Sequence, residues 1–196
     1  MEKDALRRTF EARGYTVTFV GTGAEARDYL NGKIDLTSVG FGGSETLNQI
    51  GLYDALRSHN AVVWHRNMFS DDVKHLASHA KVYVCSANAV AETGEIVNAD
   101  GNGNRLAMTM YGPEQVYLVI GRNKLVPDLP AALWRVKHVA TPKNARRFGS
   151  KLPCGNGEDC YECGSPNCMC RLVLTMYGAP GATPTELIFV DEDLGF

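Results

Sequence analysis

The sequence predicts an α/β domain, and three observations support that fold class. The chain has 196 residues, 44% of them hydrophobic, which is enough for one substantial core in a single domain over residues 1–196, alone or with an appendage. Segments with helical spacing alternate with short β-rich runs, as where Glu2–Arg13 precedes Tyr15–Val20. The run Gln115–Ile120 has the β-branched and aromatic content of a buried strand.

Charge and hydropathy exclude several classes of partner. A net charge of −2 and an isoelectric point of about 6.2 give no reason to expect binding to nucleic acid or to an anionic membrane surface. The longest apolar runs, Val116–Ile120 and Leu187–Val190, are far shorter than the ~20 residues of a membrane helix. The N-terminal segment is charged and lacks the hydrophobic core of a signal peptide, so we expect a cytoplasmic protein.

The last two strands are expected at Arg171–Tyr177 and Thr185–Val190. A turn rich in glycine and proline, GAPGATP, separates them. Because short connections of this kind join neighbouring antiparallel strands, we expect these two to pair as a hairpin.

The stretch from Ser86 to Lys124 concentrates polar residues at the junctions between predicted elements. A Thr93-Gly94 turn closes a strand pair, and the turn-forming residues of Asn98–Arg105 follow. A short helix and a strand ending in Gly-Arg-Asn-Lys complete the stretch. Because ligands of parallel sheets bind at the carboxyl ends of strands, we expect one wall of an anion site here. Arg105 and Lys124 would supply positive charge, while Asn104 and Asn123 would orient the ligand.

A second candidate wall lies between an expected strand at Asp35–Gly40 and the helix that follows it. There the Gly42-Gly43-Ser44 turn would let backbone N–H groups converge on an anion at the positive end of the helix, with Thr46 as a hydroxyl donor. The simpler alternative is that Ser44 only caps that helix. The spacing matches neither a P-loop nor a dinucleotide-binding fingerprint.

A cysteine-rich loop at residues 150–170 holds five of the six cysteines. A loop this long without hydrophobic periodicity needs some fastening, and its spacing is C-x5-C-x2-C-x4-C-x-C. Four thiolates can surround one zinc ion or one iron–sulfur cluster, with Cys160 and Cys163 as the central pair. A redox-active dithiol and a loop of unliganded thiols are the alternatives. A cluster would need covering, whereas Gly155–Gly157 suggest exposure.

Several motifs, in the same order, resemble those of the LUD-domain (lactate utilisation) family. They are GFGGSETL with IGL, SANAVAETGEIVNADGNGNRLA, VIGRNKLV, TPKNA, the cysteine loop, and the last strand with its DEDLGF tail. The resemblance covers nearly the whole chain. It implies a three-layer α/β/α Rossmann-like fold of the ribose-phosphate isomerase and CoA-transferase class.

The resemblance also implies a function and a set of site residues. Family members take part in oxidising L-lactate to pyruvate beside iron–sulfur subunits, and fold analogy suggests a homodimer. The cysteines that match the family are Cys154, Cys160, Cys163 and Cys170, with Cys168 as an extra thiol. The expected ligand-binding residues are Gly42, Gly43, Ser44, Thr46, Asn98, Gly101, Gly103, Asn104, Arg105, Asn123 and Lys124.

Two other functions remain open. An isomerase-like or transferase-like enzyme acting on a phosphorylated or CoA-linked substrate would use Asp100 or Glu92 as its acid and base, with Glu45 as a third candidate. Glu92 would otherwise be an exposed turn residue. A non-catalytic regulatory or assembly module would use the cysteine loop to dock a partner. No flavin or nicotinamide fingerprint is visible, so electrons from lactate would leave through a partner or a cluster.

Overall fold

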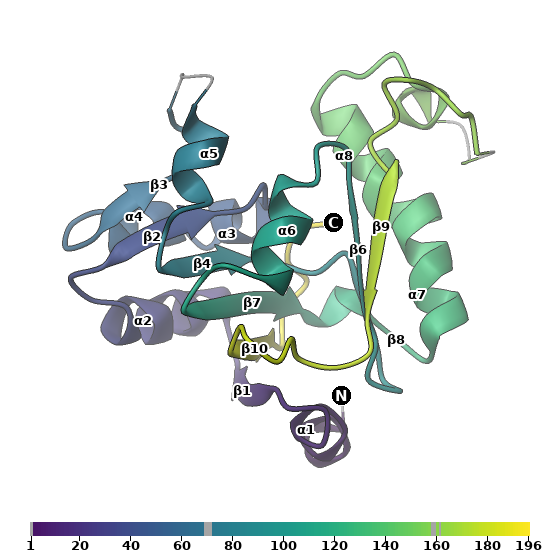
Figure 1. Cartoon of the computed structure of the whole chain (residues 1–196). Helices are drawn as coiled ribbons and strands as arrows, with labels where there is room; N and C mark the ends of the chain where they lie inside the picture. Colours follow the sequence, from purple (N-terminus) through teal and green to yellow (C-terminus); the bar gives the residue numbers. More distant parts are fainter. Residues whose placement is uncertain (1, 69–71, 158–159, 161) are drawn as a thin grey trace.

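The main body of the protein is a six-stranded parallel sheet with helices on both faces (Figure 1). This computed structural model describes residues 2–68, 72–157, 160 and 162–196. The strand order is β1-β10-β7-β4-β2-β3, and every neighbouring pair is parallel. The strands are β1 (Thr16–Val20), β2 (Ser38–Phe41), β3 (Ala61–Val63), β4 (Val82–Cys85), β7 (Gln115–Gly121) and β10 (Thr185–Val190). The three-layer Rossmann-like prediction is therefore confirmed.

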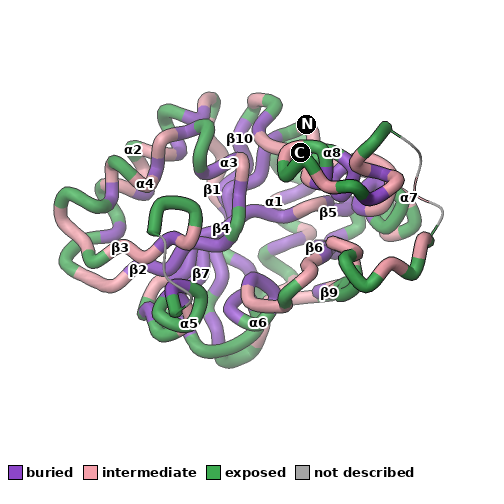
Figure 2. Tube along the Cα trace, turned by 90° about the horizontal axis from the view of Figure 1, so that it is seen from above, coloured by how far each residue is buried: buried purple, intermediate pink, exposed green. Residues whose placement is uncertain are grey.

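The two faces of this sheet bury different helices because side chains alternate along each strand. The helices α2 (Gly23–Lys33), α3 (Glu45–Gln49) and α4 (Leu52–Leu56) pack with Val39, Phe41 and Val119 on one face. On the other face, α1 (Lys3–Glu11) and α6 (Asn104–Met110) pack with Val116 and Leu118. The helix α5 (Val73–Ala77) also covers this face, opposite Gly40. Figure 2 shows the buried positions following the strands of the main sheet.

A second, four-stranded sheet lies beside the first in the order β8-β5-β6-β9. Its strands are β5 (Ala89–Ala91), β6 (Ile96–Asp100), β8 (Leu125–Val126) and β9 (Leu172–Met176). Val90 and Ile96 join the core of the main sheet, whereas the small residues Ala89 and Ala91 pack against α7 (Leu129–Arg135). The second sheet is thus held between the main core and one long helical segment (Figure 1).

That helical segment continues from α7 through the π-helical η2 (Val136–Ala140) into α8 (Thr141–Arg147). Pro142 has no N–H to donate to the carbonyl of His138, and the π-helical turn lies directly before it. Two short 3-10 turns, η1 (Arg122–Lys124) and η3 (Pro153–Asn156), complete the fold. Within the described ranges, no helix is long and apolar enough to cross a bilayer.

The expected hairpin between the last two strands is wrong. β9 pairs antiparallel with β6 in the second sheet, whereas β10 lies between β1 and β7 in the main sheet. All six residues of β10 are buried, as expected for a central strand covered on both faces. The Thr93-Gly94 turn is confirmed, because β5 and β6 pair antiparallel around it.

Packing of α5 on β2 can be tested at a glycine. A Cβ atom at Gly40 would overlap the carbonyl oxygen of Ala77, so Gly40→Ala should lower the free energy of unfolding by about 2 kcal/mol in urea titrations. Gly32 of α2 has open space around it, and Gly32→Ala should raise the same quantity by about 0.5 kcal/mol. A Gly40→Ala protein as stable as the unsubstituted one would contradict this packing.

Candidate functional site

A polar crevice lies where three adjacent strands of the main sheet end. Residues after β2 (Gly43–Thr46), after β4 (Ser86–Asn88) and after β7 (Lys124) meet there, at the carboxyl ends of their strands. Its volume is about 60 Å³, room for about four ordered waters at ~15 Å³ each. The remaining lining residues are Ala99, Arg105, Ala140, Thr141, Asn144, Arg147, Met169 and Phe196.

Lys124 is the most unusual group in the crevice. Its side chain is 3% exposed, and its Nζ donates hydrogen bonds to Thr46 Oγ1 at 2.8 Å and to Ser86 Oγ at 2.7 Å. Within the part of the chain that is described, it forms no ion pair. Burial, with smaller contributions from the charges of Arg135 and Arg105, lowers the pKa of Lys124 to about 7.

Arg105 forms the second charged wall and also holds the loop structure together. Its two terminal nitrogens donate to the Ser86 carbonyl, Asn98 Oδ1, Asn88 Oδ1 and the Ala99 carbonyl, at 2.6–3.1 Å. These acceptors are neutral, so the guanidinium charge is solvated by dipoles, and it forms no ion pair with a carboxylate among the described residues. The expectation that Arg105 brings charge to the crevice stands, although its donors at the terminal nitrogens already have protein partners.

The Gly42–Thr46 turn brings a weaker positive helix end to the crevice than the sequence predicts. The helix after it, α3, has only five residues, and Ser44 Oγ accepts from the Leu47 N–H at 3.2 Å. The capping alternative for Ser44 is therefore confirmed, although the residue does line the crevice. Gly42 lies behind it, where a Cβ would press on Cys85 and Tyr83. Positive charge here comes from side chains and not from a helix end.

Several predicted site residues lie outside the crevice. Asp100 accepts from the backbone N–H groups of Asn102 and Arg105, so its carboxylate shapes the loop. Asn98 is fully buried and holds Arg105 and the Asn88 N–H. Asn123 contacts the Leu194 N–H. Gly101, Gly103 and Asn104 do not line the crevice either.

Glu92 is also remote from the crevice. It is exposed on the turn at the far end of β5, and four residues of extended chain, about 13 Å, separate it from Asn88. The alternative of an exposed turn residue therefore describes Glu92 better than a catalytic role in the crevice.

A wider outer lobe adjoins the crevice. Its volume is about 340 Å³, and it shares Gly43, Ser44 and Arg147 with the crevice. Trp64, His65, Arg66 and Phe148 complete its lining. Glu45 Oε2 lies 2.8 Å from Arg66 and 3.1 Å from Arg147, so one carboxylate here is shared by two cations.

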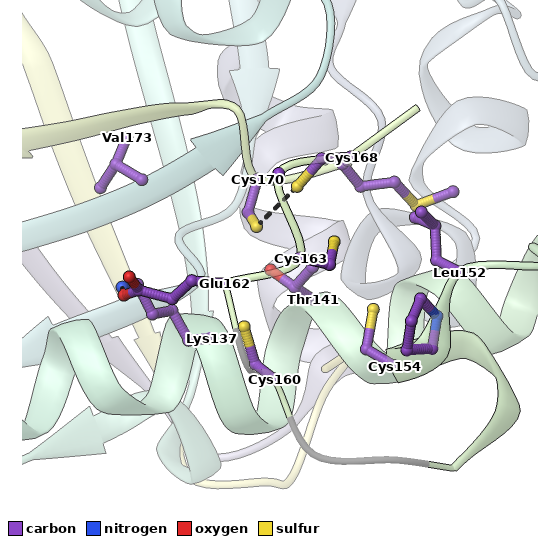
Figure 3. A pocket seen from close by; sticks show the side chains of 13 residues that line it. Lys137, Thr141, Leu152, Cys154, Cys160, Glu162, Cys163, Cys168, Cys170 and Val173 are labelled. Atoms are coloured by element: carbon purple, nitrogen blue, oxygen red, sulfur yellow. Dashed lines mark hydrogen bonds and ion pairs between the residues drawn. The ribbon is translucent and has the colours of Figure 1, made fainter. Parts of the chain in front are cut away.

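The cysteine loop encloses a cavity of about 340 Å³ lined by all five of its thiols (Figure 3). Cys168 and Cys170 Sγ atoms lie 3.1 Å apart, while Cys154 is anchored in a small apolar cluster with Ala145 and Leu152. Across the described residues, no three His, Cys, Asp or Glu side chains converge on a single metal position. Residues 158, 159 and 161 of the loop lie outside the described residues.

The crevice and the cysteine cavity are neighbours. Thr141 and Met169 line both of them. The sequence alone gives no sign of this contact, to which α8 contributes Thr141 and the cysteine loop contributes Met169.

Sequence reasoning missed several crevice residues, and a sequence signal exists for only some of them. Ser86 directly follows a buried strand, which is the same signal that identified Lys124. Arg147 and Phe196 come from segments whose packing no local pattern reveals. Asn88 lies two residues after Ser86, and its Oδ1 accepts hydrogen bonds from Arg105 and from the Ala99 N–H.

Comparison with known proteins gives one family match and one fold match. The model of the LUD domain family matches residues 4–190. The fold is similar to the crystal structure of a DUF162 family protein from Deinococcus radiodurans, with a TM-score of 0.55 and 14% identity over 97% of this chain and 99% of that one. No curated protein matches. At this identity the structural similarity establishes the fold alone.

The role of Arg105 in building the crevice can be tested by Arg105→Lys. A lysine ammonium cannot replace the forked donors, so buried acceptors would lose their partners and the free energy of unfolding should fall by about 3 kcal/mol. Arg146→Lys, on an exposed position of α8, should change it by less than about 0.5 kcal/mol. Equal stability of the two variants in urea titrations would refute this role.

Proposed function

Because the chain belongs to the LUD-domain family, whose members act in lactate utilisation, we propose that its crevice binds a small carboxylate or phosphate ligand. The protein would act as a subunit in the oxidation of L-lactate to pyruvate. The observation that carries this proposal is Lys124, a buried amine at the base of the crevice with no carboxylate partner among the described residues.

The charge balance of the crevice supports an anionic ligand. Lys124 and Arg105 line it, and Arg135 lies close enough to depress the pKa of Lys124. The acidic residue in the lining, Glu45, is already held by Arg66 and Arg147. An ammonium and a carboxylate about 4 Å apart attract each other by about 4 kcal/mol at an effective dielectric constant of 20. A bound anion would therefore relieve an unfavourable concentration of positive charge.

The size of the crevice supports a small acid over a large ester. About 60 Å³ limits the crevice to a few heavy atoms, which is nearer to lactate or inorganic phosphate than to a CoA ester. The outer lobe is the observation that favours the alternative, a phosphorylated or CoA-linked substrate with its larger part beside Trp64 and Phe148. That alternative lacks support for its acid and base, because neither Asp100 nor Glu92 lines the crevice.

The cysteine cavity supports a second part of the proposal. Its thiols have the soft-ligand chemistry that zinc and iron–sulfur clusters require, and Cys154, Cys160, Cys163 and Cys170 would hold the metal. Zinc would fasten the loop, whereas an iron–sulfur centre would carry electrons away from a ligand in the neighbouring crevice. Partner iron–sulfur subunits and a homodimer belong to the same proposal, and a regulatory module that docks a partner through this loop is the remaining alternative.

Binding of L-lactate, measured by calorimetry, should depend on pH through Lys124. The free-state pKa of Lys124 is about 7, and a bound anion raises it. Affinity should therefore be highest below pH 7 and fall as the pH rises above 7, and anion binding above pH 7 should be accompanied by proton uptake. The Cys85 thiol, which also acts on Lys124, does not titrate in this range, because burial raises its pKa to about 12.

Lys124→Met should weaken lactate binding about 30-fold, which corresponds to about 2 kcal/mol, and remove the proton uptake. It should leave the melting temperature nearly unchanged, since the loss of two hydrogen bonds is offset by the removal of a buried charge that has no carboxylate partner among the described residues. Lys143→Met is the matched control, because that exposed lysine lies on α8 outside the crevice lining. Unchanged lactate affinity in Lys124→Met, or no binding of lactate, pyruvate or phosphate to the unsubstituted protein, would refute the proposed ligand class.

Metal content should distinguish the uses of the cysteine loop. Protein purified without oxygen is expected to contain stoichiometric iron with visible absorption, or stoichiometric zinc, and Cys163→Ser should lose most of that metal. Cys168→Ser should retain it, because Cys168 is the thiol outside the proposed set of four. Metal-free protein would contradict both forms of the proposal, and equal loss in the two variants would contradict the ligand set.

A further inference from the structure

Lys124 differs from an ordinary structural lysine in the partners it has. Lys33 shows the usual arrangement: its Nζ lies 2.6 Å from Glu186 Oε2 and 2.8 Å from the Tyr29 hydroxyl. Although burial acts in the opposite direction, these contacts raise the pKa of Lys33. Lys124 is more deeply buried, yet its hydrogen-bond partners in the described structure are two neutral hydroxyls, and its amine faces the crevice.

The position of the amine is fixed from three sides. Thr46 follows β2, Ser86 follows β4 and Lys124 itself follows β7, so three neighbouring strands hold the nitrogen and its two hydroxyl partners. Ser86 Oγ also donates to the Val119 carbonyl at 2.5 Å, and Thr46 Oγ1 to the Leu194 carbonyl at 3.3 Å. A nucleophile needs this kind of fixed approach to a bound carbonyl group.

We propose that Lys124 is a nucleophile that forms an imine with the carbonyl carbon of a small 2-oxo acid bound in the crevice. The inference rests on the proposed function, because the carboxylate of that acid must occupy the crevice. It adds the substrate class, a 2-oxo acid about as small as pyruvate, and a covalent role for a residue otherwise expected only to provide charge.

The step needs no oxidant or reductant. The amine lone pair forms a C–N bond with the carbonyl carbon, the carbonyl oxygen takes up a proton, and the carbinolamine loses water to give a protonated imine. Thr46 and Ser86 contact the nitrogen and can pass protons between it and the departing oxygen. The protonated imine carries the same positive charge as an ammonium, so it still compensates the carboxylate of the ligand.

The protonation state of Lys124 agrees with this geometry. Burial first, and then the charges of Arg135 and Arg105, bring the pKa of Lys124 in the free protein to about 7, so a large fraction of the amine is neutral near pH 7.5 when the acid arrives. An ordinary lysine at that pH holds only about 0.1% of its amine in the neutral form.

Reductive trapping tests the proposal. The full chain is incubated with pyruvate and borohydride at pH 7.5, and the adduct is located by peptide mass spectrometry. We expect one adduct, equal to pyruvate less one water plus two hydrogens, with labelling of Lys124 about 100-fold above that of any exposed lysine. L-lactate, which has a hydroxyl group in place of the keto group, should slow the labelling by competing for the crevice. Lys124→Met should give no specific adduct, and Lys143→Met should label as the unsubstituted protein does.

Two results would overturn the inference. Labelling spread evenly over exposed lysines, or equal in Lys124→Met, would show that Lys124 is not the nucleophile. If calorimetry detects lactate and pyruvate binding but trapping yields no adduct at Lys124, imine formation is refuted while the proposed anion binding stands. If neither acid binds, both proposals fail together.

Discussion

The hydrogen bonds from Lys124 to Thr46 and Ser86 join the chain segments that follow three neighbouring strands of the main sheet. Parallel pairing of β7, β4 and β2 brings these three carboxyl ends to one edge, and the order of the strands makes them adjacent. Arg105 fixes the second layer of the site by binding carbonyl and amide oxygens from Ser86 to Ala99. The crevice therefore depends on two buried cations whose partners are neutral dipoles.

The architecture and one wall of the crevice could be predicted from sequence, for physical reasons. The apolar runs that became β7 and β4 are recognisable because buried parallel strands are almost uniformly hydrophobic, and a polar residue directly after such a run marks a sheet edge. Lys124, three residues after the end of β7, lies at that edge. Asp100 and Asn98 carry the same polar chemistry but use it on neighbouring backbone and on Arg105, and no sequence pattern separates a loop-shaping carboxylate from one that meets a ligand.

The arrangement of the last two strands could not be predicted because short connections usually join neighbours. Here β9 completes the second sheet and β10 crosses into the interior of the first, between β1 and β7, although few residues separate β9 from β10. Burial distinguishes the positions of the two strands. Every residue of β10 is buried, whereas Leu172 and Val173 of β9 are exposed. The same crossing brings the segment after β10 over the crevice, where Gly195 lies so close to Thr46 and Lys124 that a side chain would not fit.

The contact between the crevice and the cysteine cavity changes how the two features should be understood. The sequence predicts the anion site and the cysteine loop as two separate features, but Thr141 and Met169 line both spaces. A metal that only stabilised the loop would not need to lie beside the crevice. Lys124 is also not explained by stability. Burying its amine costs desolvation energy that an apolar side chain of similar size would not. Lys124, which has no carboxylate partner among the described residues, lines one of these spaces, and five thiols line the other. If the cysteine cavity holds an iron–sulfur centre, as proposed, this shared wall places that centre beside the ligand.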